Sequence, residues 1–205
     1  MGTAESGNLL DHVGLELLGK TAGVLGNARV ENFNALTDLI LASPRIFLTG
    51  AGRSGLVCRF FAMRLMHLGG IVYIVGETTT PAARSGDLLI TISGSGKTQT
   101  VLDIARMAKQ TGARIATIGL DIGSKSPMDE LADLSVKLNR RLNPHLRQVY
   151  AATKQIPREE RQTLTPMGTV FEIATLIYLE AIIAEVINRQ NVPESEMRER
   201  HANLE

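Results

Sequence analysis

Two glycine- and serine-rich segments constrain this chain most, because each follows a short apolar run and each opens a helical pattern. Residues 50–55 (Gly-Ala-Gly-Arg-Ser-Gly) follow the run 46–49, and residues 93–98 (Ser-Gly-Ser-Gly-Lys-Thr) follow the run 88–92. A strand, a glycine loop and a helix in succession present backbone N–H groups and a positive helix end to an anion. Two such loops, separated by one strand–helix repeat, predict a phosphorylated small molecule held from two sides.

Apolar runs alternate with helical patterns through the middle of the chain, which is typical of a parallel sheet with helices on both faces. We expect an α/β fold: a three-layer sandwich with a mostly parallel five-stranded sheet, flavodoxin-like in arrangement. Ligands of such sheets bind at the carboxyl ends of the strands, where the strand order reverses. The expected strands are 46–49, 71–75, 88–92, 114–118 and 134–138, and the helices between them are 54–68, 97–110 and 126–131.

Helical patterns also occupy both ends of the chain, which we interpret as a single domain over residues 1–205. The segment 1–42 is one interrupted helix or two, because its middle is rich in glycine. The segment 165–205 begins with Thr165 as a helix N-cap and Pro166 in the first turn. The long helix that follows is apolar on nearly all sides, so we expect it to be buried in contacts of a homo-oligomer.

Composition excludes several classes of protein. The net charge is +1 and no basic stripe is present, so nucleic acid is not an expected partner. No apolar run approaches the length of a membrane span and no signal pattern opens the chain, which favours a cytoplasmic protein. The single cysteine, Cys58, sits among apolar residues and is expected to be a buried structural thiol of a reducing compartment. The four histidines are far apart in sequence, and no metal-ligand spacing occurs.

Residues 50–55 also fit the Gly-x-Gly-x-x-Gly pattern of dinucleotide-binding proteins, and Glu77 falls near the position of a ribose-binding acid. This alternative stays open, although it leaves the second loop without a role. The second loop resembles the end of a phosphate-binding Walker A motif but lacks its first glycine, since position 91 is Thr.

The two loops resemble those of the sugar isomerase (SIS) domain family, in which a Ser-Gly-Ser-Gly-x-Thr loop and an earlier glycine loop face one phosphosugar. Over about residues 30–205 the chain is most similar to the 6-phospho-3-hexuloisomerases of that family. The segments that carry this similarity are residues 61–69, 75–81, 92–96, 165–172 and 200–205.

The resemblance implies an isomerase that converts 3-hexulose 6-phosphate to fructose 6-phosphate through a cis-enediol, in formaldehyde fixation by the ribulose monophosphate pathway. It also implies no cofactor and no metal, a tetramer, and functional coupling to 3-hexulose-6-phosphate synthase. Another phosphosugar isomerase, or a phosphosugar-binding SIS domain without catalysis, is the alternative. The expected substrate- and phosphate-binding residues are Gly52, Arg53, Ser54, Ser93, Gly94, Ser95, Lys97 and Thr98.

Three residues are candidates for the proton transfers. Glu172, expected two turns into the C-terminal helix, is the candidate base; the alternative is a structural ion pair with Arg53 or Arg64. The resemblance implies that His67 is an acid or a group that polarises a substrate oxygen, whereas its pattern alone suggests packing at a helix end. His201, in the C-terminal tail, is the second such candidate and is expected to reach the site of a neighbouring subunit.

Overall fold

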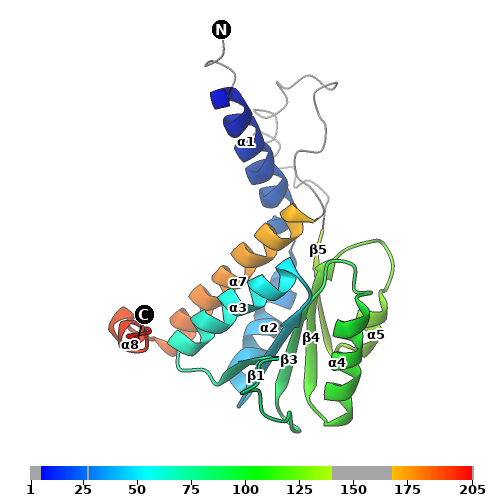
Figure 1. Ribbon diagram of the computed structural model, residues 1–205, viewed down its shortest axis with the longest axis vertical. Coiled ribbons are helices and arrows are strands. Elements are labelled where there is room, and N and C mark those ends of the chain that lie inside the picture. Colours follow the sequence, from blue (N-terminus) through cyan, green and yellow to red (C-terminus); the bar gives the residue numbers. More distant parts are fainter. Residues whose placement is uncertain (1–5, 27, 140–167, 205) are drawn as a thin grey trace.

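The computed structural model describes residues 6–26, 28–139 and 168–204, and Figure 1 shows their arrangement. Five strands form one sheet in the order β2-β1-β3-β4-β5, and every neighbouring pair is parallel. The expected α/β fold is therefore confirmed, with the flavodoxin-like strand order. The strands are β1 (Ile46–Gly50), β2 (Val72–Ile74), β3 (Leu88–Ile92), β4 (Arg114–Leu120) and β5 (Leu134–Leu138).

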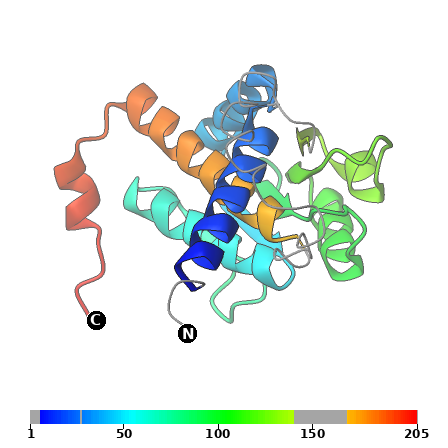
Figure 2. The same cartoon turned by 90° about the horizontal axis from the view of Figure 1, so that it is seen from above.

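Helices cover both faces of the sheet and give the predicted three layers. One layer contains α2, α3 and α7, with α1 packed on α7, and the other contains α4 and α5 (Figures 1 and 2). The described helices are α1 (Ser6–Leu25), α2 (Val30–Ala42), α3 (Arg53–His67), α4 (Gln99–Gln110), α5 (Pro127–Leu131), α7 (Thr169–Gln190) and α8 (Glu194–Glu199). The N-terminal pattern is thus two helices, of which α1 projects from the body (Figure 1).

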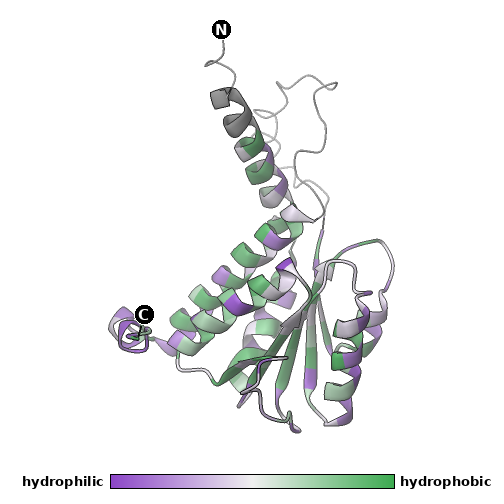
Figure 3. Cartoon of the chain, in the orientation of Figure 1, coloured by the Kyte–Doolittle hydropathy of each residue, from purple (hydrophilic) through white to green (hydrophobic). Residues whose placement is uncertain are grey.

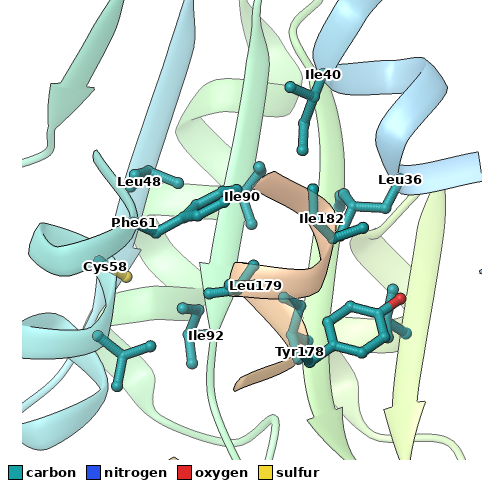
Figure 4. Close-up of a cluster of buried hydrophobic side chains, with 14 of the residues drawn as sticks. Leu36, Ile40, Leu48, Cys58, Phe61, Ile90, Ile92, Tyr178, Leu179 and Ile182 are labelled. Atoms are coloured by element: carbon teal, nitrogen blue, oxygen red, sulfur yellow. The ribbon is translucent and has the colours of Figure 1, made fainter. Parts of the chain in front are cut away.

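The two faces of the sheet build two apolar clusters, because successive side chains of a strand point to opposite sides. Leu48 and Ile90 lie in the cluster that also holds Phe61 of α3 and Leu179 of α7 (Figure 4). The preceding residue of β1, Phe47, belongs to the cluster under α4. Burial on both faces explains why these strands are continuous apolar runs in the sequence.

The long C-terminal helix α7 begins later than the sequence suggested. Its N-cap position is Gly168, with a φ of 91°, and its first residue is Thr169. The expected cap at Thr165 was therefore wrong for this helix, and Thr165 itself lies outside the described residues, as does the segment 140–167. Much of helix α7 is hydrophobic in Figure 3, and eight of its 22 residues are buried, whereas Ile177 is 44% exposed. Among the described residues, none of the helices has the length and apolar character required to cross a membrane.

Candidate functional site

The two glycine loops leave the sheet side by side. Strands β1 and β3 are neighbours, and the ladder pairs Gly50, at the end of β1, with Ile92, at the end of β3. After β1 the chain continues to β2 on one side of β1, and it then returns to β3 on the other side. The loops therefore flank the point where the strand order reverses, which is where sheets of this kind bind ligands.

The first loop leads directly into α3. Gly52 occupies the N-cap position and Arg53 is the first helical residue. Ser54 is buried in the first turn, whereas the Arg53 side chain is half exposed. The N–H groups of this turn and the positive end of the helix dipole thus open toward the same edge of the sheet as the second loop.

The second loop is a compact turn stabilised by its own hydroxyl groups. The Gly96 N–H donates to Ser93 Oγ at 3.2 Å, and the Lys97 N–H donates to Ser95 Oγ at 3.2 Å. The Ser93 and Thr98 hydroxyls lie 3.3 Å apart. Ser93 is buried, Ser95 and Lys97 are exposed, and α4 begins immediately afterwards, at Gln99. This arrangement suits an anion that approaches from solvent toward the start of α4.

Helix α7 brings Glu172 to the two loops. Arg53 Nε lies 3.3 Å from Glu172 Oε2, and Arg53 Nη1 donates to Thr169 Oγ1 at 3.1 Å. Phe171 packs on the second loop, so closely that a Cβ on Gly94 would lie 3.2 Å from its ring. A helix more than a hundred residues after the first loop in the sequence thus closes the site formed by the two loops.

Glu172 lies in the first turn of α7 and not two turns into it, because the helix begins at Thr169. The positive end of a helix favours a carboxylate there, so its position is less costly than the sequence suggested. Its side chain is only 14% exposed, and Oε2 is buried without a hydrogen-bond partner, although Arg53 is within ion-pair distance. The carboxylate therefore keeps an acceptor that a bound ligand can use.

The structure places His67 and His201 together, but away from the loops. Their rings stack with centroids 5.1 Å apart and planes 22° apart. His67 is the last residue of the 15-residue helix α3. At a rise of about 1.5 Å per residue, this pair lies about 20 Å along the helix from Arg53. The end of α3 at which the pair lies is near α8 (Figure 1) and opposite the loops.

A hydrogen bond from Arg200 and the burial of His67 hold the histidine pair in place. Arg200 Nη1 donates to the backbone oxygen of His67 at 3.1 Å, which ties the C-terminal tail to the end of α3. His67 is buried, whereas His201 is exposed. Burial lowers the pKa of His67 below 6.5, and the positive charges of His201 and Arg64 lower it further. Near neutral pH the buried ring is therefore uncharged and can accept a proton or a hydrogen bond.

Thr169 is a residue of this cluster that sequence reasoning did not single out. It lies three residues before Glu172, so both face the same side of α7 and meet Arg53. The spacing of three residues between Thr169 and Glu172, which places both on one face of a helix, is the sequence signal that points to Thr169. In the part of the chain that is described, no three His, Cys, Asp or Glu side chains are close enough to hold a metal ion. The expected independence from metals remains a prediction.

Comparison with known proteins identifies the family. Residues 39–158 match the model of the SIS domain, which is more than half of the chain. The chain belongs to the SIS domain family. It is 40% identical to a 3-hexulose-6-phosphate isomerase of Methylomonas aminofaciens, over 92% of this chain and 96% of that protein. It is 43% identical to a 3-hexulose-6-phosphate isomerase of Methanocaldococcus jannaschii, over 83% of each chain. Within the SIS domain family, it is therefore a member of the 3-hexulose-6-phosphate isomerases.

A solved structure shows the same fold in this family. The hypothetical protein MJ1247 from Methanococcus jannaschii, for which a molecular function of 3-hexulose-6-phosphate isomerase has been inferred, superimposes with a TM-score of 0.73 at 39% identity. The match covers 97% of this chain and 99% of that one. The dinucleotide-binding alternative is not supported by these matches, because the chain matches the SIS domain model and its relatives are named 3-hexulose-6-phosphate isomerases.

Proposed function

We propose that this SIS-domain protein is an isomerase that interconverts 3-hexulose 6-phosphate and fructose 6-phosphate, in formaldehyde fixation by the ribulose monophosphate pathway. The observation that carries the proposal is the meeting of two phosphate-type loops with the Arg53–Glu172 pair at the reversal of strand order. The named relatives, about 40% identical over most of their length, support the same reaction. Another phosphosugar isomerase, or a binding module without catalysis, is not favoured by these relatives.

Phosphate binding is assigned to the second loop. The hydroxyls of Ser93, Ser95 and Thr98 and the start of α4 provide donors toward one anion, whereas the Gly96 and Lys97 N–H groups bond to the Ser93 and Ser95 hydroxyls and hold the turn. Lys97 is exposed, and its charge suits attraction of the phosphate more than direct burial against it. From the first loop, Gly52, Arg53 and Ser54 would face the sugar and its oxygens.

The reaction moves one proton between neighbouring carbons. In our mechanism Glu172 removes the proton from carbon 2 of the 3-ketose, which leaves an enediolate across carbons 2 and 3. The same carboxyl group then returns the proton to carbon 3, while a proton passes from the oxygen of carbon 2 to the oxygen of carbon 3. The buried Oε2 of Glu172 makes no hydrogen bond and lies within ion-pair distance of Arg53, which supports its role as base. Arg53 is placed to stabilise negative charge that develops on the oxygens.

The histidines enter this mechanism only from a second copy of the chain. Within one chain they lie about 20 Å from Arg53, too far to touch the same sugar. We therefore propose that His67 and His201 of one subunit complete the site of another, in a homotetramer, where the exposed His201 moves protons between the substrate oxygens and the buried His67 stacks behind it. Two apolar side chains of α3 near His67 are partly exposed, Met63 at 42% and Met66 at 38%. Their exposure supports a contact with another subunit there.

Two further expectations concern the setting of the enzyme. The single cysteine, Cys58, is buried and free, which supports a location in the reducing cytoplasm. The substrate would come from 3-hexulose-6-phosphate synthase, the functional partner that the family resemblance implies.

A coupled assay tests the function directly. Fructose 6-phosphate is supplied with 3-hexulose-6-phosphate synthase from a separate source, and release of formaldehyde reports formation of 3-hexulose 6-phosphate. We expect release that depends on this protein and persists with a chelator present. Binding of fructose 6-phosphate without any release would contradict the proposed reaction, and loss of release with the chelator would contradict independence from metals.

A further inference from the structure

The candidate phosphate loop rests directly on the start of α5. Gly96 has a φ of +61°, and a Cβ built on it would lie 2.2 Å from Ser126 Oγ. The Met128 N–H donates to the Gly96 oxygen at 3.2 Å. Because Gly96 lies in the middle of the loop, the position of α5 determines where the N–H groups of the loop can lie.

Ser126 is held in place by Asp129, one turn later in α5. Asp129 Oδ2 accepts from the Ser126 N–H at 2.7 Å and from its hydroxyl at 2.8 Å, and the Asp129 N–H returns a longer bond of 3.4 Å to Ser126 Oγ. This reciprocal capping fixes the first turn of a helix that is only five residues long. Such a short helix has little stability of its own, so its position depends on tertiary contacts.

The strongest of these contacts comes from β5. Lys137 Nζ lies 2.6 Å from both carboxylate oxygens of Asp129. The Asp129 side chain is 5% exposed, and the Lys137 side chain is 29% exposed. Burial alone would raise the pKa of Asp129, but hydrogen bonds from Lys137 and Ser126 outweigh it and the pKa is lowered. Asp129 is therefore ionised at neutral pH, and its ion pair with Lys137 links the sheet, through α5, to the loop.

We propose that Lys137 and Asp129 are positioning residues for phosphate binding, because they hold α5 against Gly96 and so keep the 93–98 loop in its anion-binding arrangement. This inference rests on the proposed function for the nature of the ligand. Neither residue has to touch the substrate. The phosphate does not react, so the loop binds it equally in the ground state and in the transition state. Loss of the pair should then raise KM and leave kcat unchanged.

The test is Lys137→Met, which removes the ion pair with Asp129 and leaves the hydrogen bonds between Ser126 and Asp129 intact. We expect the Kd for fructose 6-phosphate, measured by calorimetry, and the KM to rise about tenfold, with kcat within about twofold of the original. Lys137→Arg, which keeps the charge, should return both constants to within about threefold of the original. Should Lys137→Met fail to fold, Ser126→Ala interrupts the same contacts one step closer to the loop and should also raise KM alone.

A matched ion pair at the opposite edge of the same sheet is the control. Arg45 Nε donates to Asp87 Oδ1 at 3.0 Å and Arg45 Nη2 to Oδ2 at 2.6 Å, and the Asp87 side chain is 2% exposed. These residues immediately precede β1 and β3, at the amino ends of the strands. Arg45→Met should lower Tm about as much as Lys137→Met, with Kd and KM unchanged.

Two outcomes would overturn the inference: equal changes of KM in the two Met variants, or a loss of kcat at constant KM in Lys137→Met. The calorimetric Kd separates this inference from the proposed function. If the original protein binds fructose 6-phosphate but does not isomerise it, the proposed reaction fails, and a tenfold weaker Kd in Lys137→Met would still support the positioning role.

Discussion

Helix α3 begins at one group of candidate residues and ends at another, and the two groups are assembled to different degrees. At its start, Arg53 meets Glu172 of α7 and the second loop lies alongside on the neighbouring strand. At its end, His67 stacks on His201, and Arg200 ties the C-terminal tail to the same helix end. The first group joins two loops and two helices at one edge of the sheet, whereas the second joins the C-terminal tail to one helix end.

The difference follows from how each group is built. The loops need only two adjacent parallel strands and the helices that follow them, which one chain provides. The histidine pair depends on a tail residue laid against a helix end by Arg200, with one ring buried and the other open to solvent. The predictions below test whether these two groups belong to one reaction.

The largest effect is expected from Glu172→Gln. It removes the candidate base at the first group without changing the size of the side chain, so turnover should fall by about a thousandfold or more. The Kd for fructose 6-phosphate, measured by calorimetry, should change little. Glu180→Gln is the matched control, because Glu180 is on the same helix and lies 3.6 Å from Arg64. Equal losses in both variants would make Glu172 a structural residue.

The next effect concerns His67 and links the two groups. His67→Asn should lower kcat by about a hundredfold. This variant is then mixed with an equal amount of Glu172→Gln, and the subunits are dissociated and reassembled at random. About a quarter of the sites should regain activity, because a quarter of them combine an intact Glu172 from one subunit with an intact His67 from the other. Activity that stays at the level of the separate variants would contradict a site shared between subunits.

A smaller effect is expected at the second loop. Ser95→Ala removes a hydroxyl that accepts from the Lys97 N–H. The lost hydrogen bonds should raise the Kd for fructose 6-phosphate about three- to tenfold. Inhibition by inorganic phosphate should weaken in parallel, whereas kcat should hold. Ser85, an exposed serine before β3 and thus at the other edge of the sheet, provides the control Ser85→Ala. Unchanged affinity in Ser95→Ala would remove this hydroxyl from the site.

The smallest effect is a dependence of stability on pH. The folded protein lowers the pKa of His67 below 6.5, so the unfolded chain binds more protons in that range. The stability contributed by the neutral ring is complete above pH 6.5 and is lost as the pH falls through the lower, folded value. Urea unfolding is measured at about pH 7.5 and about pH 5.5. The free energy of unfolding should fall less between these two pH values in His67→Gln than in the original protein. An identical pH dependence of the two proteins would contradict this assignment.

Much of the fold followed from the sequence because its signals are local. The strands at 46–50 and 88–92 are continuous apolar runs, and the glycines that follow them mark where each strand turns into a helix. Ser126 followed by Pro127 predicted the start of α5, and the structure has a capping box there. The start of α7 was misplaced, because Thr165 and Pro166 form an attractive cap pattern and the cap position of the described helix is instead Gly168.

The sequence by itself determined the parallel α/β sheet, the two anion-type loops and the identity of Glu172 and Arg53 as candidates. Only the tertiary structure decided that Arg53 meets Glu172 and Thr169, that the histidines pair at the far end of α3, and that α5 supports Gly96. The physical reason is the separation in sequence over which each signal acts. Strand and loop signals come from neighbouring residues, whereas these contacts join residues far apart in the chain and depend on how the helices pack across the sheet.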